Sequence, residues 1–107
     1  AWQEHLIAEV VGPMSLDVAD MDADGDLDVV CGEHNLKHPD KARLLVFENL
    51  GGTGADWREH LVHQGDEHHD GAQVFDLDND GDLDIVSIGW GHAKVVWYEQ
   101  LGAAEEL

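Results

Sequence analysis

The sequence has few basic residues, few cysteines and no long apolar run. Only 5 Lys and Arg stand against 24 Asp and Glu in 107 residues, which gives a formal net charge of −19. We therefore expect neither nucleic acid nor an anionic membrane as a partner. The single cysteine, Cys31, excludes an internal disulfide. No segment has the character of a transmembrane helix or a signal peptide. A chain of this length is expected to form one small domain over residues 1–107.

Ten of the 24 acidic residues stand in two stretches of the same spacing, residues 20–28 and 76–84. Each reads Asp-x-Asp-x-Asp-Gly-Asp-Leu-Asp, and so many carboxylates at short range repel one another unless a cation neutralises them. Carboxylates at loop positions 1, 3, 5 and 9, a carbonyl at 7 and glycine at 6 suit calcium. A solvated acidic turn is the alternative, and two identical copies argue against it.

We therefore predict two calcium ions per chain. The ligands of the first ion are the side chains of Asp20, Asp22, Asp24 and Asp28 and the carbonyl of Asp26. The ligands of the second are the side chains of Asp76, Asp78, Asp80 and Asp84 and the carbonyl of Asp82.

Other phrases of the sequence also occur twice. Residues 2–7, Trp-Gln-Glu-His-Leu-Ile, return as Trp-Arg-Glu-His-Leu-Val at residues 57–62, an offset of 55. Residues 47–51, Phe-Glu-Asn-Leu-Gly, return as Tyr-Glu-Gln-Leu-Gly at residues 98–102, an offset of 51, and the acidic stretches are 56 apart. Two copies of a unit of about 50 to 55 residues are typical of a propeller or another repeat array.

Short segments rich in β-branched and aromatic residues predict an all-β fold, and no segment shows sustained helical periodicity. The expected strands of the first unit are residues 16–19, 27–32, 43–48 and 57–63. Those of the second unit are residues 72–75, 83–88 and 94–99.

The second unit is therefore one strand short of a propeller blade, which has four strands. Residues 2–7 have the sequence of the missing strand. We expect two four-stranded blades per chain. Blade one covers about residues 14–63, and blade two about residues 71–101 together with a strand over residues 2–7.

Two blades cannot close a ring, because propellers typically have four to eight. Each copy is therefore expected to give residues 2–7 to the last blade of a neighbouring copy, in a closed head-to-tail ring of three or four copies. Two alternatives stay open. The chain is a two-blade fragment of a longer protein, or the strand folds back onto its own chain.

A second group of polar residues stands in the loops expected opposite the acidic stretches. Its members are Glu33, His34, Glu67, His68, His69, Trp90 and His92. Imidazole with carboxylate suits an additional transition metal or an acid–base pair, and an indole suits stacking on a sugar. A solvated polar rim is the alternative. Gly12-Pro13 replaces His68-His69 in the first unit, so the fold does not require these residues.

The succession of apolar strand, acidic stretch, Val29-Val30 or Ile85-Val86, aromatic-Glu strand end and Trp-x-x-His strand resembles the FG-GAP/VCBS repeat family of calcium-binding β-propellers. The resemblance covers residues 2–102. It implies calcium in the loop between the first two strands of each blade, an extracellular or periplasmic location, and adhesion, carbohydrate-related or scaffold roles. It implies no reaction, and two repeats are fewer than family members usually carry.

EF-hand and dockerin domains share the loop spacing, but they place helices beside the loop. The residues that follow each acidic stretch, Val29-Val30 and Ile85-Val86, are poor helix starts. The propeller interpretation is therefore favoured.

Two functional classes follow. The favoured one is a calcium-stabilised propeller module that assembles with other copies and binds a carbohydrate or protein ligand or acts as a scaffold. The alternative is a fragment or relative of a propeller enzyme that acts on carbohydrate through a metal in the histidine-rich loops. No Ser-His-Asp spacing, phosphate-binding glycine loop or Cys-His zinc pattern is present, so no catalytic residue is assigned.

Overall fold

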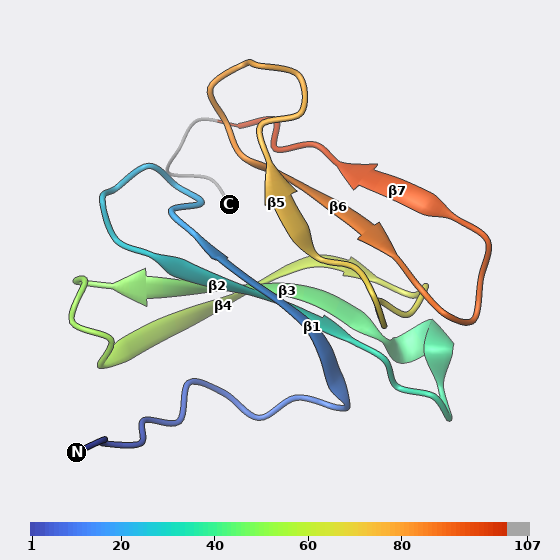
Figure 1. Cartoon of the computed structure of the whole chain (residues 1–107), viewed down its shortest axis with the longest axis horizontal. Helices are drawn as coiled ribbons and strands as arrows, with labels where there is room; N and C mark the ends of the chain where they lie inside the picture. Colours follow the sequence, from blue (N-terminus) through green and yellow to red (C-terminus); the bar gives the residue numbers. More distant parts are fainter. Residues whose placement is uncertain (103–107) are drawn as a thin grey trace.

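The computed structural model describes residues 1–102, which form an all-β fold of two antiparallel sheets (Figure 1). The first sheet has the order β1-β2-β3-β4, and the second has the order β5-β6-β7. The strands are β1 (Pro13–Ala19), β2 (Asp28–Glu33), β3 (Arg43–Leu50), β4 (Asp56–Gln64), β5 (Gln73–Phe75), β6 (Asp84–Ile88) and β7 (Val95–Tyr98). A 3-10 turn, η1 (Pro39–Lys41), is the one helical element of the described residues.

The all-β class is confirmed, and of the eight expected strands the seven that lie between residues 16 and 99 each overlap an observed strand. Residues 103–107 of the expected domain lie outside the described residues. Within residues 1–102 no helix has the length and apolar character needed to span a membrane.

The central strands of the first sheet are buried on both faces. Leu44 and Leu45 are neighbours in β3, so they point to opposite faces, and both are 0% exposed. The continuous apolar run of this strand reflects that double burial. The edge strands β1 and β4 instead alternate between exposed and half-buried positions.

One face of the first sheet packs against the second sheet. We call this the inner face, and it carries Val30, Leu44 and Val46, which form a buried cluster with Ala72 and Ile85 of the second unit. The strands β1 and β5 lie side by side where the two sheets meet (Figure 1). A hydrogen bond from the backbone N–H of Val74 to the Asp17 carboxylate, 2.8 Å long, joins them.

The opposite face of the first sheet, which we call the outer face, carries Cys31, Leu45 and Phe47. Ala8 and Val10 of the N-terminal segment pack against it. This placement accounts for the buried, unpaired state of the one cysteine.

Residues 1–12 form no strand in the described chain, and residues 1–7 are exposed and belong to neither sheet (Figure 1). Trp2 is 101% exposed. The strand expected over residues 2–7 is therefore not formed within a single copy, and these residues do not fold back onto β7. The edge of β7 that faces away from β6 has no strand partner among the described residues.

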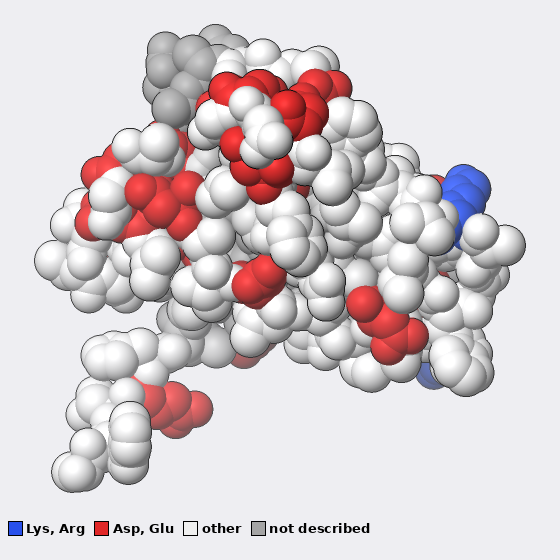
Figure 2. Space-filling model, turned by 45° about the horizontal axis from the view of Figure 1, so that its top comes forward, with Lys and Arg blue, Asp and Glu red and all other residues white. Residues whose placement is uncertain are grey.

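The two acidic loops, residues 20–27 and 76–83, lie at one end of the sheets, and the loops that follow β2, β4 and β6 lie at the other end (Figure 1). Figure 2 shows Asp and Glu side chains gathered over the end with the acidic loops and basic side chains at the opposite edge. The expected separation of the acidic and histidine-rich loops is thus present.

Candidate functional site

The first acidic loop curls around the side chain of its first aspartate. The Asp20 carboxylate accepts hydrogen bonds from the backbone N–H groups of Asp24, at 3.1 Å, and Gly25, at 2.8 Å. Gly25 has φ of 94°, a left-handed conformation that glycine adopts without strain. The second loop repeats this geometry with Asp76, Asp80 and Gly81. The identical spacing in the sequence therefore gives the same backbone conformation twice.

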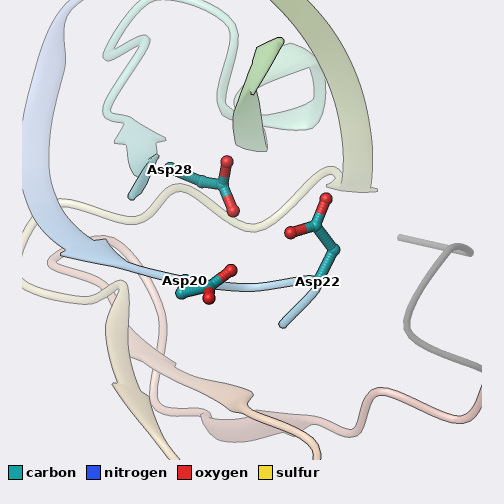
Figure 3. A group of neighbouring side chains, drawn as sticks. All are labelled: Asp20, Asp22 and Asp28. Atoms are coloured by element: carbon teal, nitrogen blue, oxygen red, sulfur yellow. The ribbon is translucent and has the colours of Figure 1, made fainter. Parts of the chain in front are cut away.

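The carboxylates of each loop converge. In the first loop, ligand oxygens lie within 4.8 Å of one another in two sets of three, Asp20, Asp22 and Asp28, and Asp22, Asp24 and Glu48. In the second loop the equivalent sets are Asp76, Asp78 and Asp84, and Asp78, Asp80 and Glu99. Figure 3 shows the side chains of Asp20, Asp22 and Asp28 directed toward one another. Such an all-oxygen donor set fits a hard divalent cation.

The last aspartate of each loop also has a structural task. Asp28 is 0% exposed, and its carboxylate accepts hydrogen bonds from the backbone N–H groups of Met21 and Asn49, each at 2.9 Å. It thereby joins the loop to the end of β3. The Asp84 carboxylate does the same with Leu77 and Gln100. Each carboxylate oxygen has two lone pairs, so these bonds leave room for a cation.

The electrostatics of the first loop reflect crowded negative charge. Burial, a side-chain hydrogen bond with Asp24 and the charge of Asp28 together raise the pKa of Asp22 to about 7. The pKa of Asp24 is lowered, because its carboxylate accepts the backbone N–H of Asp26. A carboxyl group with a pKa raised this far lacks a compensating positive charge in its surroundings, and a bound cation would supply one.

Two acidic residues of these sets, Glu48 and Glu99, were missed by the sequence prediction. They come from the ends of the third strand of each unit, at equivalent positions of the repeated aromatic-Glu phrase. That repetition was the signal that could have identified them. The side chains of Asp26 and Asp82 belong to none of the four sets, and the prediction for these two concerned their backbone carbonyls.

At the opposite end, the structure brings together five of the seven predicted loop residues. His34 Nδ1 lies 2.7 Å from Glu67 Oε2, and the rings of His34 and His69 are 4.7 Å apart. The Trp90 ring is 5.9 Å from that of His69 and is 74% exposed. His92 Nε2 is 2.9 Å from the backbone carbonyl oxygen of Glu67.

Glu67 is the centre of this group. It is 2% exposed, and its carboxylate accepts the backbone N–H groups of His69 and Gly91 as well as the His34 ring. Burial alone would raise the pKa of Glu67, but these hydrogen bonds outweigh it and lower the pKa. Glu67 is therefore a charged anchor. A cavity of about 330 Å³ lies beside it, lined by Pro39, Asp40, Gly65, Asp66, Glu67, Gly91 and His92.

The structure places the other two predicted residues, Glu33 and His68, in structural roles. Glu33 is buried at the end of β2, where it accepts two hydrogen bonds from the Arg43 side chain and one from the backbone N–H of Val11. His68 is 1% exposed, and its Nδ1 lies 2.6 Å from Ser87 Oγ. Burial lowers the pKa of His68 to about 4. Neither side chain is available to a ligand at the loop surface.

Comparison of the chain with protein-family models, with curated proteins and with solved structures found no match. We therefore infer the function from the geometry of the described residues.

Proposed function

We propose that the chain is a calcium-stabilised β-propeller module of the FG-GAP/VCBS type, with one calcium ion in each acidic loop. The observation that supports this most directly is the convergence of carboxylate oxygens within 4.8 Å in both loops. Four aspartates and one glutamate supply oxygen donors and no nitrogen or sulfur, which favours calcium over zinc or copper. The loops are partly exposed, which leaves coordination positions for water.

In this proposal the ion has a structural role. A cation between Asp20, Asp22 and Asp28 would join the loop to the first residue of β2, and Glu48 would extend the link to β3. Binding only to the folded state stabilises that state by about 2.7 kcal/mol when free calcium is 100 times the dissociation constant. We place the module in an extracellular or periplasmic setting, where calcium sites of modest affinity are filled.

Titration calorimetry of the calcium-free chain tests the proposal. We expect two ions per chain, and one ion for Asp22→Asn and for Asp78→Asn. Asp56→Asn is the matched control, because Asp56 is an exposed acid at the start of β4, outside both loops. Absence of calcium binding, or equal loss in the control, would overturn the proposal.

A second candidate function is ligand binding at the histidine-rich loops, and the 2.7 Å contact between His34 and Glu67 favours it. Glu67 orients the His34 ring and leaves its other nitrogen for a hydrogen bond. The exposed indole of Trp90 offers a stacking surface. The metal-binding sets found among residues 1–102 contain no histidine. We propose a carbohydrate or a protein loop as the ligand of these loops.

Tryptophan fluorescence during titration with a panel of oligosaccharides tests this second function. Binding that disappears in Trp90→Ala and in His34→Ala supports it. Binding unchanged in both variants would contradict it, and product formation would shift the assignment to the carbohydrate-active enzyme class.

A further inference from the structure

The interface between the two sheets provides a template for a second interface. Because the units are repeats, each buried residue of the inner face has an equivalent in the second unit. Val30 corresponds to Val86 at the offset of 56 residues, and Val46 corresponds to Trp97 at the offset of 51. The pairing is also conserved between the units, since Val30 lies opposite Val46 and Val86 lies opposite Trp97.

These equivalent residues differ sharply in exposure. Leu44 and Val46 are 0% and 2% exposed in the first sheet, whereas their equivalents Val95 and Trp97 are 77% and 44% exposed. In the acidic loops, Met21 is 5% exposed and its equivalent Leu77 is 53% exposed. The second sheet thus has the same apolar surface as the inner face of the first sheet, and no sheet within residues 1–102 covers it. We call this surface the open face, defined by Leu77, Val86, Val95 and Trp97.

The complementary surface is the outer face of the first sheet. Ala8 and Val10 cover its centre. Its edges carry two leucines that are 69% and 56% exposed, Leu16 opposite Cys31 and Leu61 opposite Leu45. Its residues Cys31 and Phe47 are equivalent to Ser87 and Tyr98, and Tyr98 packs against the inner face within the chain. The outer face of one copy can therefore contact the open face of another copy in the same way that the second sheet contacts the inner face of the first sheet. A single copy has one of each, and they point away from each other.

The N-terminal segment is placed relative to the outer face as the end of β4 is placed relative to the second sheet. Ala8 is equivalent to His63 at the offset of 55. Ala8 packs against the cluster that contains Phe47, and the His63 ring is 5.4 Å from that of Tyr98, the equivalent of Phe47. Residues 2–7 are thus in position to continue as the fourth strand of a sheet stacked on the outer face.

The register follows from the β3–β4 pair. Val46 lies opposite His60, and Glu48 lies opposite Arg58. With the repeat offsets of 51 and 55 residues, the equivalent pairs between β7 and residues 2–7 are Trp97 with His5 and Glu99 with Gln3. In the first sheet His60 Nε2 is 2.8 Å from Glu48 Oε1. Among the described residues, Glu99 of the second unit has no histidine in the place that His60 takes beside Glu48.

The chain cannot supply this strand to its own β7. The backbone N–H of Val11 is fixed to Glu33 Oε2 at 2.8 Å, and Ala8 and Val10 pack on the outer face. The second sheet lies on the other side of the first sheet. Stacked sheets are about 10 Å apart. To pair with β7 of the same copy, residues 2–7 would have to detach from the outer face and pass around the first sheet.

We propose that a second copy of this chain docks its open face on the outer face of the first copy, and that residues 2–7 of the first copy pair with β7 of the second. This inference deepens the proposed function, since it names the partner that completes the blade. The contact is head-to-tail, so each copy receives a strand at one end and gives one at the other, and rotation closes three or four copies into a ring.

Light scattering in calcium tests the assembly. The intact chain, 11.8 kDa, is expected at three or four times that mass. Deletion of residues 1–7 and Trp97→Glu are each expected to give monomers with an unchanged circular dichroism spectrum. Leu36→Glu is the matched control, because Leu36 is 72% exposed outside both faces, and it is expected to assemble. A monomeric intact chain, or a deletion that keeps the full mass, would overturn the proposal.

Disulfide trapping tests the register independently of mass. A Gln3→Cys chain mixed with a Glu99→Cys chain is expected to form a linked pair, because residues directly opposite in antiparallel strands have Cα atoms within disulfide range. A chain with both substitutions is expected to form linked oligomers. An internal disulfide in a monomer, or no link at all, would contradict the proposal.

Calorimetry on the monomeric variants separates this inference from the calcium proposal. Trp97→Glu is expected to bind two calcium ions while failing to assemble. Loss of assembly without loss of calcium binding confirms that the open face acts through contact between copies. Loss of both assembly and calcium binding would show that Trp97→Glu is unfolded. The chain that lacks residues 1–7 then tests the contact between copies in its place.

Discussion

The carboxylate of Asp28 lies 2.9 Å from the backbone nitrogen of Asn49, so a loop aspartate fixes the end of β3. The same carboxylate accepts the backbone N–H of Met21 at the start of the loop. This one side chain therefore holds three chain segments at the candidate calcium site. The equivalent contact of Asp84 with Gln100 repeats it in the second unit.

Replacement of Asp28 tests whether its hydrogen bonds to Met21 and Asn49 stabilise the fold. Asp28→Asn is expected to lower the free energy of unfolding by about 1 to 3 kcal/mol, because an amide has one acceptor oxygen and leaves a buried N–H unpaired. Urea unfolding in the absence of calcium measures the effect without the ion. Asp26→Asn in the same loop serves as control, and an equal effect in both variants would refute the structural role.

The two glutamates missed by the sequence prediction have a separable effect. Glu48→Gln is expected to weaken calcium binding at the first site roughly tenfold to a hundredfold, as for groups that support a metal site. Glu99→Gln should act on the second site only. Calorimetry of both variants checks this, and an unchanged affinity in each would remove these residues from the sites.

The ion pair between buried Glu33 and half-buried Arg43 is expected to make the free energy of unfolding depend on pH in the acid range. Burial alone would raise the pKa of Glu33, but hydrogen bonds from Arg43 and from the backbone of Val11 outweigh it and lower the pKa below its value of 4.5. A carboxyl group with a lowered pKa in the folded state stabilises that state above pH 4.5, and this stabilisation is lost as the pH falls.

Glu33→Gln is expected to cost about 1 to 3 kcal/mol at pH 7, since it leaves the half-buried Arg43 guanidinium with Glu59, 3.6 Å away, as its remaining acidic partner. The cost should shrink at pH 3. Urea unfolding of both proteins at the two pH values gives the comparison. A cost that does not depend on pH would mean that Glu33 contributes packing and no charge.

His68 is a base where Glu33 is an acid, yet both make the free energy of unfolding fall as the pH is lowered. Its pKa falls to about 4 on burial, below its ordinary value of 6.5. The unfolded chain therefore binds a proton that the folded chain refuses, and stability is lost as the pH falls from 6.5 toward 4. The loss between pH 7 and pH 5 is about 2 kcal/mol at about 1.4 kcal/mol per pKa unit.

Asp22 works against this trend in calcium-free protein, since its pKa is raised to about 7 and its protonation favours the folded state. The comparison of His68→Gln with the parent chain isolates the histidine. The variant is expected to show a smaller loss of unfolding free energy between pH 7 and pH 5. An identical loss in both proteins would show that His68 does not titrate in this range.

The strand positions and both acidic loops could be predicted because they depend on local sequence. Alternating and continuous apolar runs placed β2 and β3, and the spacing from Asp20 to Asp28 determined the loop conformation. The convergence of His34 with Glu67 was expected from the position of the loops alone. Loop topology decides such proximity before any side-chain detail.

The roles of Glu33 and His68 could not be predicted, because burial and partner choice are tertiary properties. Nothing in the sequence around Glu33 distinguishes it from Glu67. In the structure Glu33 forms an ion pair with Arg43 of the neighbouring strand. Ser87 similarly holds His68 between the sheets. The participation of Glu48 also required the third strand to return beside the loop.

Thermal unfolding with and without a calcium chelator measures whether calcium holds the carboxylates of both loops together. We expect a lower melting temperature in chelator, restored by excess calcium and not by magnesium. Removal of carboxylates from both loops, as in Asp22→Asn with Asp78→Asn, should abolish the difference. A melting temperature that is the same in calcium and in chelator would contradict the account.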